Sequence, residues 1–227
     1  MKISIDDLFD LLQNAPATGN VFNPWFDVDP VNDVGPKAPE IRRNHLRRFL
    51  EQRLSKARYL LIAEAVGYQG GHFSGIAMTS ERILLGHHAA RGVQPEHLVA
   101  GITPQRTSKP EIIANGFSEP TATIVWQAIM QSGHNPFDYV LWNIFPWHPF
   151  RPEKGFLSNR TPAKQELLAG VPAVEKMLAF FGKAKIAAIG RKSAAVLEDL
   201  GIAATPMRHP AQGGANQFRR QFPKIGV

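Results

Sequence analysis

The chain of 227 residues is 44% hydrophobic and 20% charged, a composition that excludes disordered and fibrous proteins and predicts one sizeable core. It holds no apolar run long enough to cross a membrane, and the acidic start MKISIDDLFDLL is unlike a secretory signal, so we expect a cytoplasmic protein without a membrane partner. The absence of cysteine excludes disulfides, thiolate metal sites and a cysteine nucleophile.

The basic charge is concentrated after the N-terminal segment. The net charge is +7 at pH 7, yet residues 1–40 hold seven acidic and two basic side chains, so the rest of the chain carries +12. The strongly basic charge of residues 41–227 indicates a polyanion such as nucleic acid as the partner, although many cytosolic enzymes share this charge balance.

Residues 1–39 predict an N-terminal appendage packed on the core. Ile5, Leu8, Phe9 and Leu12 have the spacing of one helix face, and a connector rich in Pro and Asn follows.

Residues 40–57 predict a second helix. Its apolar residues recur at helical spacing, and we expect its basic residues to form a solvated face: Arg42, Arg43, Arg47, Arg48, Arg53 and Lys56.

Four short apolar runs then alternate with helical patterns. The runs are 58–65, 138–146, 185–190 and 202–210, and the predicted helices are 121–132, 163–182 and 192–200, the second of these starting at an N-cap and N1 pair, Thr161 and Pro162. Such alternation is typical of a parallel sheet with helices on both faces. We therefore predict a single α/β domain over residues 1–227, a three-layer α/β/α arrangement with a central, mostly parallel four-stranded sheet.

Polar residues stand where each predicted strand ends. Glu64 ends the first strand, Asn143 the second, a Gly-Arg-Lys-Ser turn the third and His209 the fourth. Ligands of open parallel sheets bind outside the carboxyl ends of the strands, so we expect these groups to share one site. The Gly-Arg-Lys-Ser turn opens a helix, whose backbone N–H groups suit a phosphate.

The same strand ends carry four recognisable motifs. They are AEAVGYQGGHFSGIAMTSER at 63–82, DYVLWNIFPWHP at 138–149, GRKS at 190–193 and RHPAQGG at 208–214. In this order, over about residues 60–215, they resemble the motifs of the uracil-DNA glycosylase superfamily. The chain lacks the cysteines of the iron-sulfur branch, so the resemblance extends to the superfamily and not to one branch.

The resemblance implies roles for Asn143 and His209. Asn143 would read uracil, because one carboxamide offers a donor and an acceptor that complement O4 and N3–H. His209, as a neutral N–H donor to O2, would stabilise the departing base, and one such donor contributes roughly 3–4 kcal/mol. The structural alternatives are a strand-end cap for Asn143 and a satisfied buried group for His209.

The chain departs from the superfamily pattern at the water-activating position. Ala65 stands where the best-known branch has an Asp, and a methyl group can neither polarise nor orient a water. Glu64 is then the expected catalytic carboxylate, and its alternative role is to accept hydrogen bonds from loop N–H groups.

Two further departures concern the base pocket. Gly67 stands where the strictest branch has a Tyr that excludes thymine, which predicts a wider substrate range, with Tyr68 one residue away. Met78 stands where an aromatic ring stacks on the base, with Phe73 as a substitute, and either side chain has a core role as its alternative. The expected uracil-binding residues are Asn143, Ala65, Gly67, Tyr68, Phe73 and Met78.

The loop after His209 is the candidate for the wedge that enters the DNA, and basic residues on both sides of the site would contact phosphates. The expected DNA-binding residues are Arg191, Lys192, Ser193, Arg208, Gln212, Gly213, Gly214, Arg219 and Arg220. A solvated C-terminal helix is the alternative for the last of these. Residues 148–160 are expected to supply another DNA-facing loop. His72, His87 and His88 lack a carboxylate at ligand spacing, so we predict no metal site and expect them at the surface.

Together these patterns predict a monomeric DNA-repair enzyme of base excision repair, acting near the nucleoid without a cofactor. It would flip uracil out of DNA and hydrolyse its N-glycosidic bond. The first alternative is a DNA-binding protein for uracil or damaged bases that hydrolyses poorly, and a second is a small α/β hydrolase of nucleosides or nucleotides.

Overall fold

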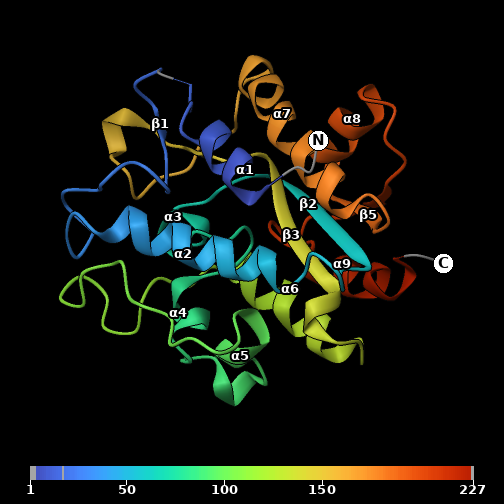
Figure 1. Ribbon diagram of the computed structural model, residues 1–227, viewed down its shortest axis with the longest axis horizontal. Helices are drawn as coiled ribbons and strands as arrows, with labels where there is room; N and C mark the ends of the chain where they lie inside the picture. Colours follow the sequence, from blue (N-terminus) through green and yellow to red (C-terminus); the bar gives the residue numbers. More distant parts are fainter. Residues whose placement is uncertain (1–3, 17, 226–227) are drawn as a thin grey trace.

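The computed structural model describes residues 4–16 and 18–225 and places a four-stranded parallel sheet at the centre of the molecule (Figure 1). The strand order is β3-β2-β5-β6, and every pair is parallel. In Figure 1, α1, α7 and α8 lie on one side of β2 and β3, and α2 to α6 lie on the other. This arrangement confirms the predicted α/β class and its central sheet.

The regular elements follow one another along the chain as α1 Ile5–Leu12, β1 Val21–Phe22, α2 Ala38–Glu51, β2 Tyr59–Ala65, α3 Gly71–Ser74, α4 Glu81–Leu84, α5 Pro95–Leu98, α6 Pro120–Gln131, β3 Tyr139–Phe145, β4 His148–Pro149, α7 Lys164–Phe181, β5 Lys185–Ile189, α8 Arg191–Asp199, β6 Thr205–Met207 and α9 Ala215–Gln221. Four 3-10 turns connect them, at Ala89–Arg91, Pro136–Asp138, Pro152–Lys154 and Phe222–Lys224. Within the described part of the chain, no helix is both long enough and apolar enough to pass through a membrane.

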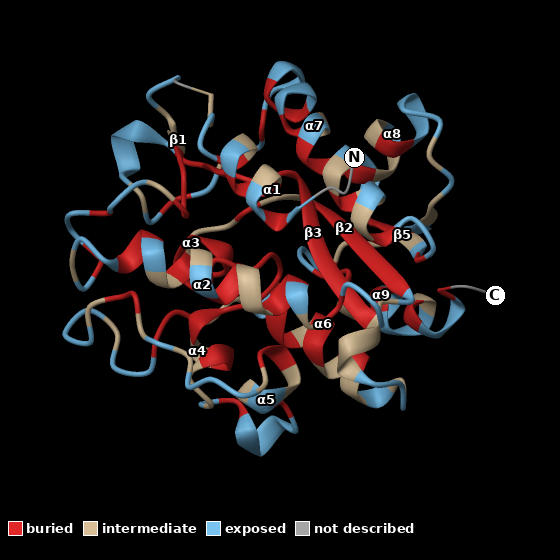
Figure 2. Ribbon diagram, viewed as in Figure 1, coloured by how far each residue is buried: buried red, intermediate tan, exposed pale blue. Residues whose placement is uncertain are grey.

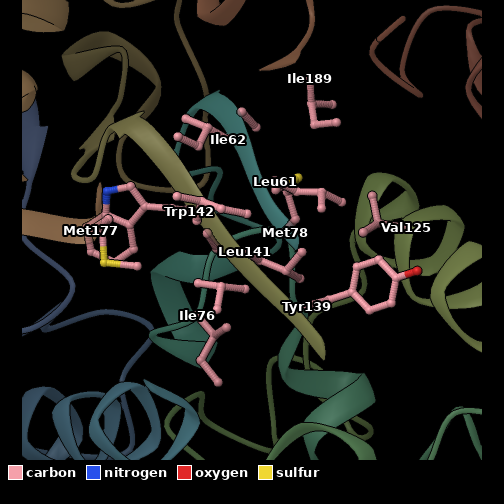
Figure 3. Close-up of a cluster of buried hydrophobic side chains, with 14 of the residues drawn as sticks. Leu61, Ile62, Ile76, Met78, Val125, Tyr139, Leu141, Trp142, Met177 and Ile189 are labelled. Carbon is pink, nitrogen blue, oxygen red and sulfur yellow. The ribbon is translucent and has the colours of Figure 1, made fainter. Parts of the chain in front are cut away.

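Strands β2 and β3, which pair with each other, are buried along most of their length (Figure 2). All seven residues of β3 are buried, as are the first five of β2, and side chains from both helical layers close over them (Figure 3). Burial on both faces explains why these strands are continuous apolar runs without alternation. Only the last two residues of β2, Glu64 and Ala65, become partly exposed, which marks the edge where the sheet meets solvent.

Three predicted boundaries are wrong. The helix expected over residues 40–57 is α2, which ends at Glu51. The last strand spans only Thr205–Met207, within the run expected at 202–210. The helix expected to begin at Thr161 and Pro162 starts at Lys164, with Ala163 as its N-cap. The cause is Glu166, whose carboxylate accepts a 2.7 Å hydrogen bond from the N–H of Ala163 and is itself held by Arg160.

The N-terminal segment packs on the sheet layers through apolar and ionic contacts. Helix α1 contacts α2 and α7, and the short strand β1 pairs antiparallel with β4. Asp33 forms a buried ion pair with Arg42 of α2 at 2.7 Å. Because each charge has lost its water shell, neither partner tolerates removal of the other.

The basic face of α2 is not solvated throughout, contrary to expectation. Arg42 and Arg53 are buried, and Arg53 donates to the carbonyl oxygens of Tyr139, Phe49 and Leu98 at 2.7–2.9 Å. Arg53, in the turn after α2, therefore connects this turn to the amino end of β3 and to α5, whereas Arg42 connects α2 to the N-terminal segment through Asp33 and the carbonyl oxygen of Asp27.

Helix α7 approaches β3 more closely than any side chain at Gly170 would allow. A Cβ at this position would lie 2.0 Å from the carbonyl oxygen of Ile144, next to Asn143. We expect Gly170→Ala to lower the free energy of unfolding by about 1–3 kcal/mol, because α7 must move off the strand. Denaturant titration measures this loss. Leu168→Ala, on the exposed side of the same helix, is the control and should change stability by less than about 1 kcal/mol. Equal stability of Gly170→Ala and wild type would show that the close approach is not required.

Candidate active site

A cavity of about 940 Å³ opens at the carboxyl ends of β2, β5 and β6. Its walls come from the end of β2 (64–67), the start of α6 (119–121), the loop 159–162, the β5–α8 turn (189–192) and the segment after β6 (207–212 without Pro210). Five basic side chains and two carboxyl groups line it: Arg151, Arg160, Arg191, Lys192, Arg208, Glu64 and Glu119. The excess of positive charge suits a polyanionic ligand.

His209 lies in this wall with a defined tautomer. Its Nδ1 accepts a 3.1 Å hydrogen bond from the backbone N–H of Ala211, so the proton of the neutral ring is on Nε2. Burial, assisted by the charge of Arg208, lowers the pKa of His209 below its usual value. The imidazole is therefore a neutral N–H donor at neutral pH.

The close approach of Gly190 fixes the position of His209. A Cβ at Gly190 would lie 3.3 Å from the Cβ of His209, and the φ of +97° at Gly190 is one that favours glycine. The backbone of the β5–α8 turn at Gly190 thus packs against the side chain of His209.

Glu64, near the end of β2, also lines the cavity and forms an ion pair with Lys192, which follows β5. The Nζ of Lys192 lies 3.4 Å from Oε1 of Glu64, and both side chains are partly exposed. Arg191 is exposed at the first turn of α8, lines the cavity and forms no salt bridge with the described residues. Ser193 is different, since its buried hydroxyl donates to the carbonyl oxygens of Ile189 and Gly190 at 2.9 Å. Its side chain serves the turn and does not reach the cavity.

Asn143 lies on β3 opposite Ala63 and is only 2% exposed. It is not among the residues of the cavity wall. Its Oδ1 is buried and accepts no hydrogen bond from the described residues. Leaving a buried acceptor unpaired costs roughly 1–3 kcal/mol, which a bound group that donates to it would recover.

Of the remaining base-pocket candidates, the structure brings only Ala65 and Gly67 to the cavity wall. Phe73 is buried and stacks on Phe117 at 4.2 Å, and the half-buried Tyr68 meets the same ring edge-on. Met78 lies in the hydrophobic core beside β2 (Figure 3), at a left-handed φ of 46°. None of these three side chains is part of the cavity wall.

The candidate DNA-binding loop borders the cavity on one side. Arg208 and Gln212 line the wall and are joined by a 3.2 Å hydrogen bond from the Arg208 guanidinium to the Gln212 carbonyl oxygen. Gly213 is exposed, whereas Gly214 packs against the carbonyl oxygen of His209. Arg219 and Arg220 are exposed on the last turn of α9, outside the wall.

Several cavity residues had no sequence signal. Glu119 comes from a stretch without a recognisable pattern, and Asn159 and Arg160 come from the loop expected only in general terms to face DNA. Asn159 accepts a 3.0 Å hydrogen bond from the N–H of Tyr68, and Arg160 is held by Glu166 at 2.6 Å. The loop after β4 is thereby attached to the end of β2 and to α7.

The surface placement expected for three histidines is wrong for two of them. His72 and His88 are buried, and His87 is exposed. His72, in α3, is buried against β1 and β4: its ring stacks on Phe22 and its Nδ1 lies 2.9 Å from Nδ1 of His148. In the described part of the chain, no group of three or more His, Asp or Glu side chains is arranged to hold a metal ion.

The comparison with known proteins rests on structure alone. No protein-family model matches the sequence, and no curated protein matches it. The structure is similar to the crystal structure of wild-type SMUG2 from Pedobacter heparinus, with a TM-score of 0.61 over 99% of this chain and 97% of that chain, at 12% identity. The chain therefore shares the overall fold of that protein, an α/β fold around a central parallel sheet as predicted.

Proposed function

We propose that the protein is a monofunctional uracil-DNA glycosylase, a hydrolase that flips uracil out of DNA and leaves an abasic site. The observation that carries this proposal is the neutral imidazole of His209, with its proton on Nε2, in a basic cavity at the carboxyl edge of the sheet. The shared fold with SMUG2 supports it.

The reaction requires stabilisation of the negative charge that develops on the departing base. When the N-glycosidic bond breaks, the base leaves with the electron pair and its O2 becomes negative. A neutral Nε2–H of His209 donates to that oxygen without competing for the proton, since burial holds the pKa of the ring low. Protein walls in place of bulk water strengthen this hydrogen bond.

Recognition of the base is assigned to Asn143. Its unpaired Oδ1 suits the N3–H of uracil, and its amide N–H suits O4. Cytosine would present the reverse pattern and leave both groups of the buried carboxamide unpaired. Because Asn143 lies behind the wall, the base must enter more deeply than the open cavity extends.

The basic residues at the rim of the cavity would bind DNA independently of its base sequence. Arg191 and Lys192 on one side, and Arg208 beside the Gln212 loop on the other, would hold the phosphates that flank the flipped nucleotide. The exposed Gln212–Gly213 tip is the proposed wedge that fills the vacated place in the stack.

A damaged-base binding protein is the second candidate, and Ala65 is the observation that favours it, since it offers no group for water activation. An oligonucleotide with one uracil, incubated with the protein and heated in alkali, separates the two. Strand cleavage at the uracil supports the glycosylase, and retarded mobility without cleavage supports the binding protein.

His209→Ala tests the assignment of the anion-stabilising donor. We expect single-turnover release of uracil to fall roughly 100- to 1,000-fold, with duplex affinity nearly unchanged, because the hydrogen bond is made fully only in the transition state. Rapid-quench kinetics and a gel-shift titration measure the two quantities. An unchanged rate constant would remove His209 from the chemistry.

Asn143→Asp tests the assignment of the base reader. A carboxylate replaces the amide donor with an acceptor, so excision of uracil should fall and excision of cytosine should become detectable. Rates on matched oligonucleotides with uracil or cytosine at one position measure the preference. Retention of the wild-type ratio would mean that another residue reads the base edge.

Arg191→Gln tests the phosphate contacts at the mouth. We expect weaker binding to every duplex sequence and a decrease of about 1 in the slope of log affinity against log salt. Arg91→Gln, an equally exposed arginine on the 3-10 turn Ala89–Arg91, is the matched control. Identical salt slopes for the two variants would show that Arg191 does not contact a DNA phosphate.

A further inference from the structure

Glu119 is a cavity residue whose side chain has no structural role in the described protein. It stands at the N-cap of α6, yet its side chain makes no capping hydrogen bond, and only its backbone oxygen is used, by Thr123. The carboxyl group lines the cavity together with Glu64 and His209.

No hydrogen bond or ion pair from the described residues reaches either carboxyl oxygen of Glu119. Oε2 is buried, although the residue as a whole is partly exposed. The five basic residues of the wall are not within ion-pair distance, and two of them have carboxylate partners of their own, Arg160 with Glu166 and Lys192 with Glu64. A buried carboxyl oxygen without a donor is costly, so its retention in a cavity indicates a partner that is not part of the protein.

The loop after β2 leaves room for this carboxyl group by means of two glycines. A Cβ at Gly70 would lie 2.3 Å from Oε2, and a Cβ at Gly67 would lie 3.4 Å from Oε1. Glu119 therefore occupies space that any side chain at position 70 would fill, directly beside the segment that carries Ala65.

Hydrolysis at C1′ requires a water that is held and deprotonated, and the two other candidates serve this need poorly. Ala65 has no polar atom. Glu64 is engaged by Lys192 at 3.4 Å, so one of its oxygens already has a partner from the protein.

We propose that Glu119 is the catalytic carboxylate that holds the attacking water, a role that rests on the proposed glycosylase function. One oxygen accepts a hydrogen bond from the water. As the C1′–N bond breaks, its electron pair leaves on the base, the water oxygen forms the new bond to C1′, and the water's proton passes to Glu119. The product is an abasic sugar with a hydroxyl at C1′, and the base takes up a proton from solvent.

The electrostatic environment agrees with this role. Burial raises the pKa of Glu119 to about 7, so the group exchanges protons readily near neutral pH. The charged and titratable groups that share its cavity are Glu64, Arg151, Arg160, Arg191, Lys192, Arg208 and His209. The ionised form is the active one, so the single-turnover rate should rise with pH through about 7 and level off above it.

Glu119→Gln is the first test, because it keeps the shape and removes the proton acceptor. We expect single-turnover release of uracil to fall at least about 100-fold and the rise with pH to disappear, with duplex affinity within about twofold of wild type. Glu111→Gln, an exposed residue away from the cavity, is the matched control and should retain the rate and the pH profile.

Two further variants keep the proposal falsifiable if Glu119→Gln folds poorly. Glu119→Ala opens space beside Gly70, and added formate should restore part of its activity in proportion to concentration. Gly70→Ala should displace the wild-type carboxyl group and lower the rate as well. Wild-type rates in Glu119→Gln would overturn the role of Glu119 but leave the proposed glycosylase function intact. The absence of formate rescue in a folded Glu119→Ala would have the same consequence. A wild-type protein that releases no base from uracil DNA would overturn the proposed function, and this proposal with it.

Discussion

The parallel direction of the four central strands is the constraint on which the site depends. Because every strand points the same way, the chain returns to one edge of the sheet each time a strand ends, and Glu64, Gly190 and His209 meet there although up to 145 positions separate them. The pairing of β2 with β3 sets Ala63 opposite Asn143, one residue before Glu64. Sheet register therefore sets the position of the Asn143 carboxamide relative to Glu64.

The walls above that edge are held by a buried polar network that begins in the N-terminal segment. His148 donates from Nε2 to the carbonyl oxygen of Ser158 at 2.8 Å, so its Nδ1 accepts from Nδ1 of His72 at 2.9 Å. Burial lowers the pKa of both rings, and Nε2 of His72 lies 3.4 Å from a carboxylate oxygen of Asp29. The network joins β4 and the cavity loop behind it to the loop after β2.

The sequence predicted those features that depend on neighbouring residues, namely the strands and the positions where they end. Apolar runs and their ends placed the sheet and brought Glu64, Arg191 and His209 to one cavity, because strand direction follows from alternation with helices. Burial of Arg42 and Arg53 was not predictable, since their acceptors belong to segments up to 86 positions away. The same limit applied to Glu119, whose environment consists of two glycines some 50 positions earlier. The resemblance implied a base contact for Phe73 and Met78; in the structure Phe73 stacks on Phe117 and Met78 lies in the hydrophobic core, so neither lines the open cavity.

Two carboxyl groups in one cavity have opposite environments, and this division organises the proposed chemistry. Glu64 is paired with Lys192 at the carboxyl end of β2, whereas Oε2 of Glu119 is buried and no cation of the described residues forms an ion pair with this carboxyl group. The ion pair occupies Glu64, so this carboxylate is less available to hold a water. In the proposed mechanism Glu119 therefore accepts the proton, and Glu64 positions Lys192 at the cavity wall.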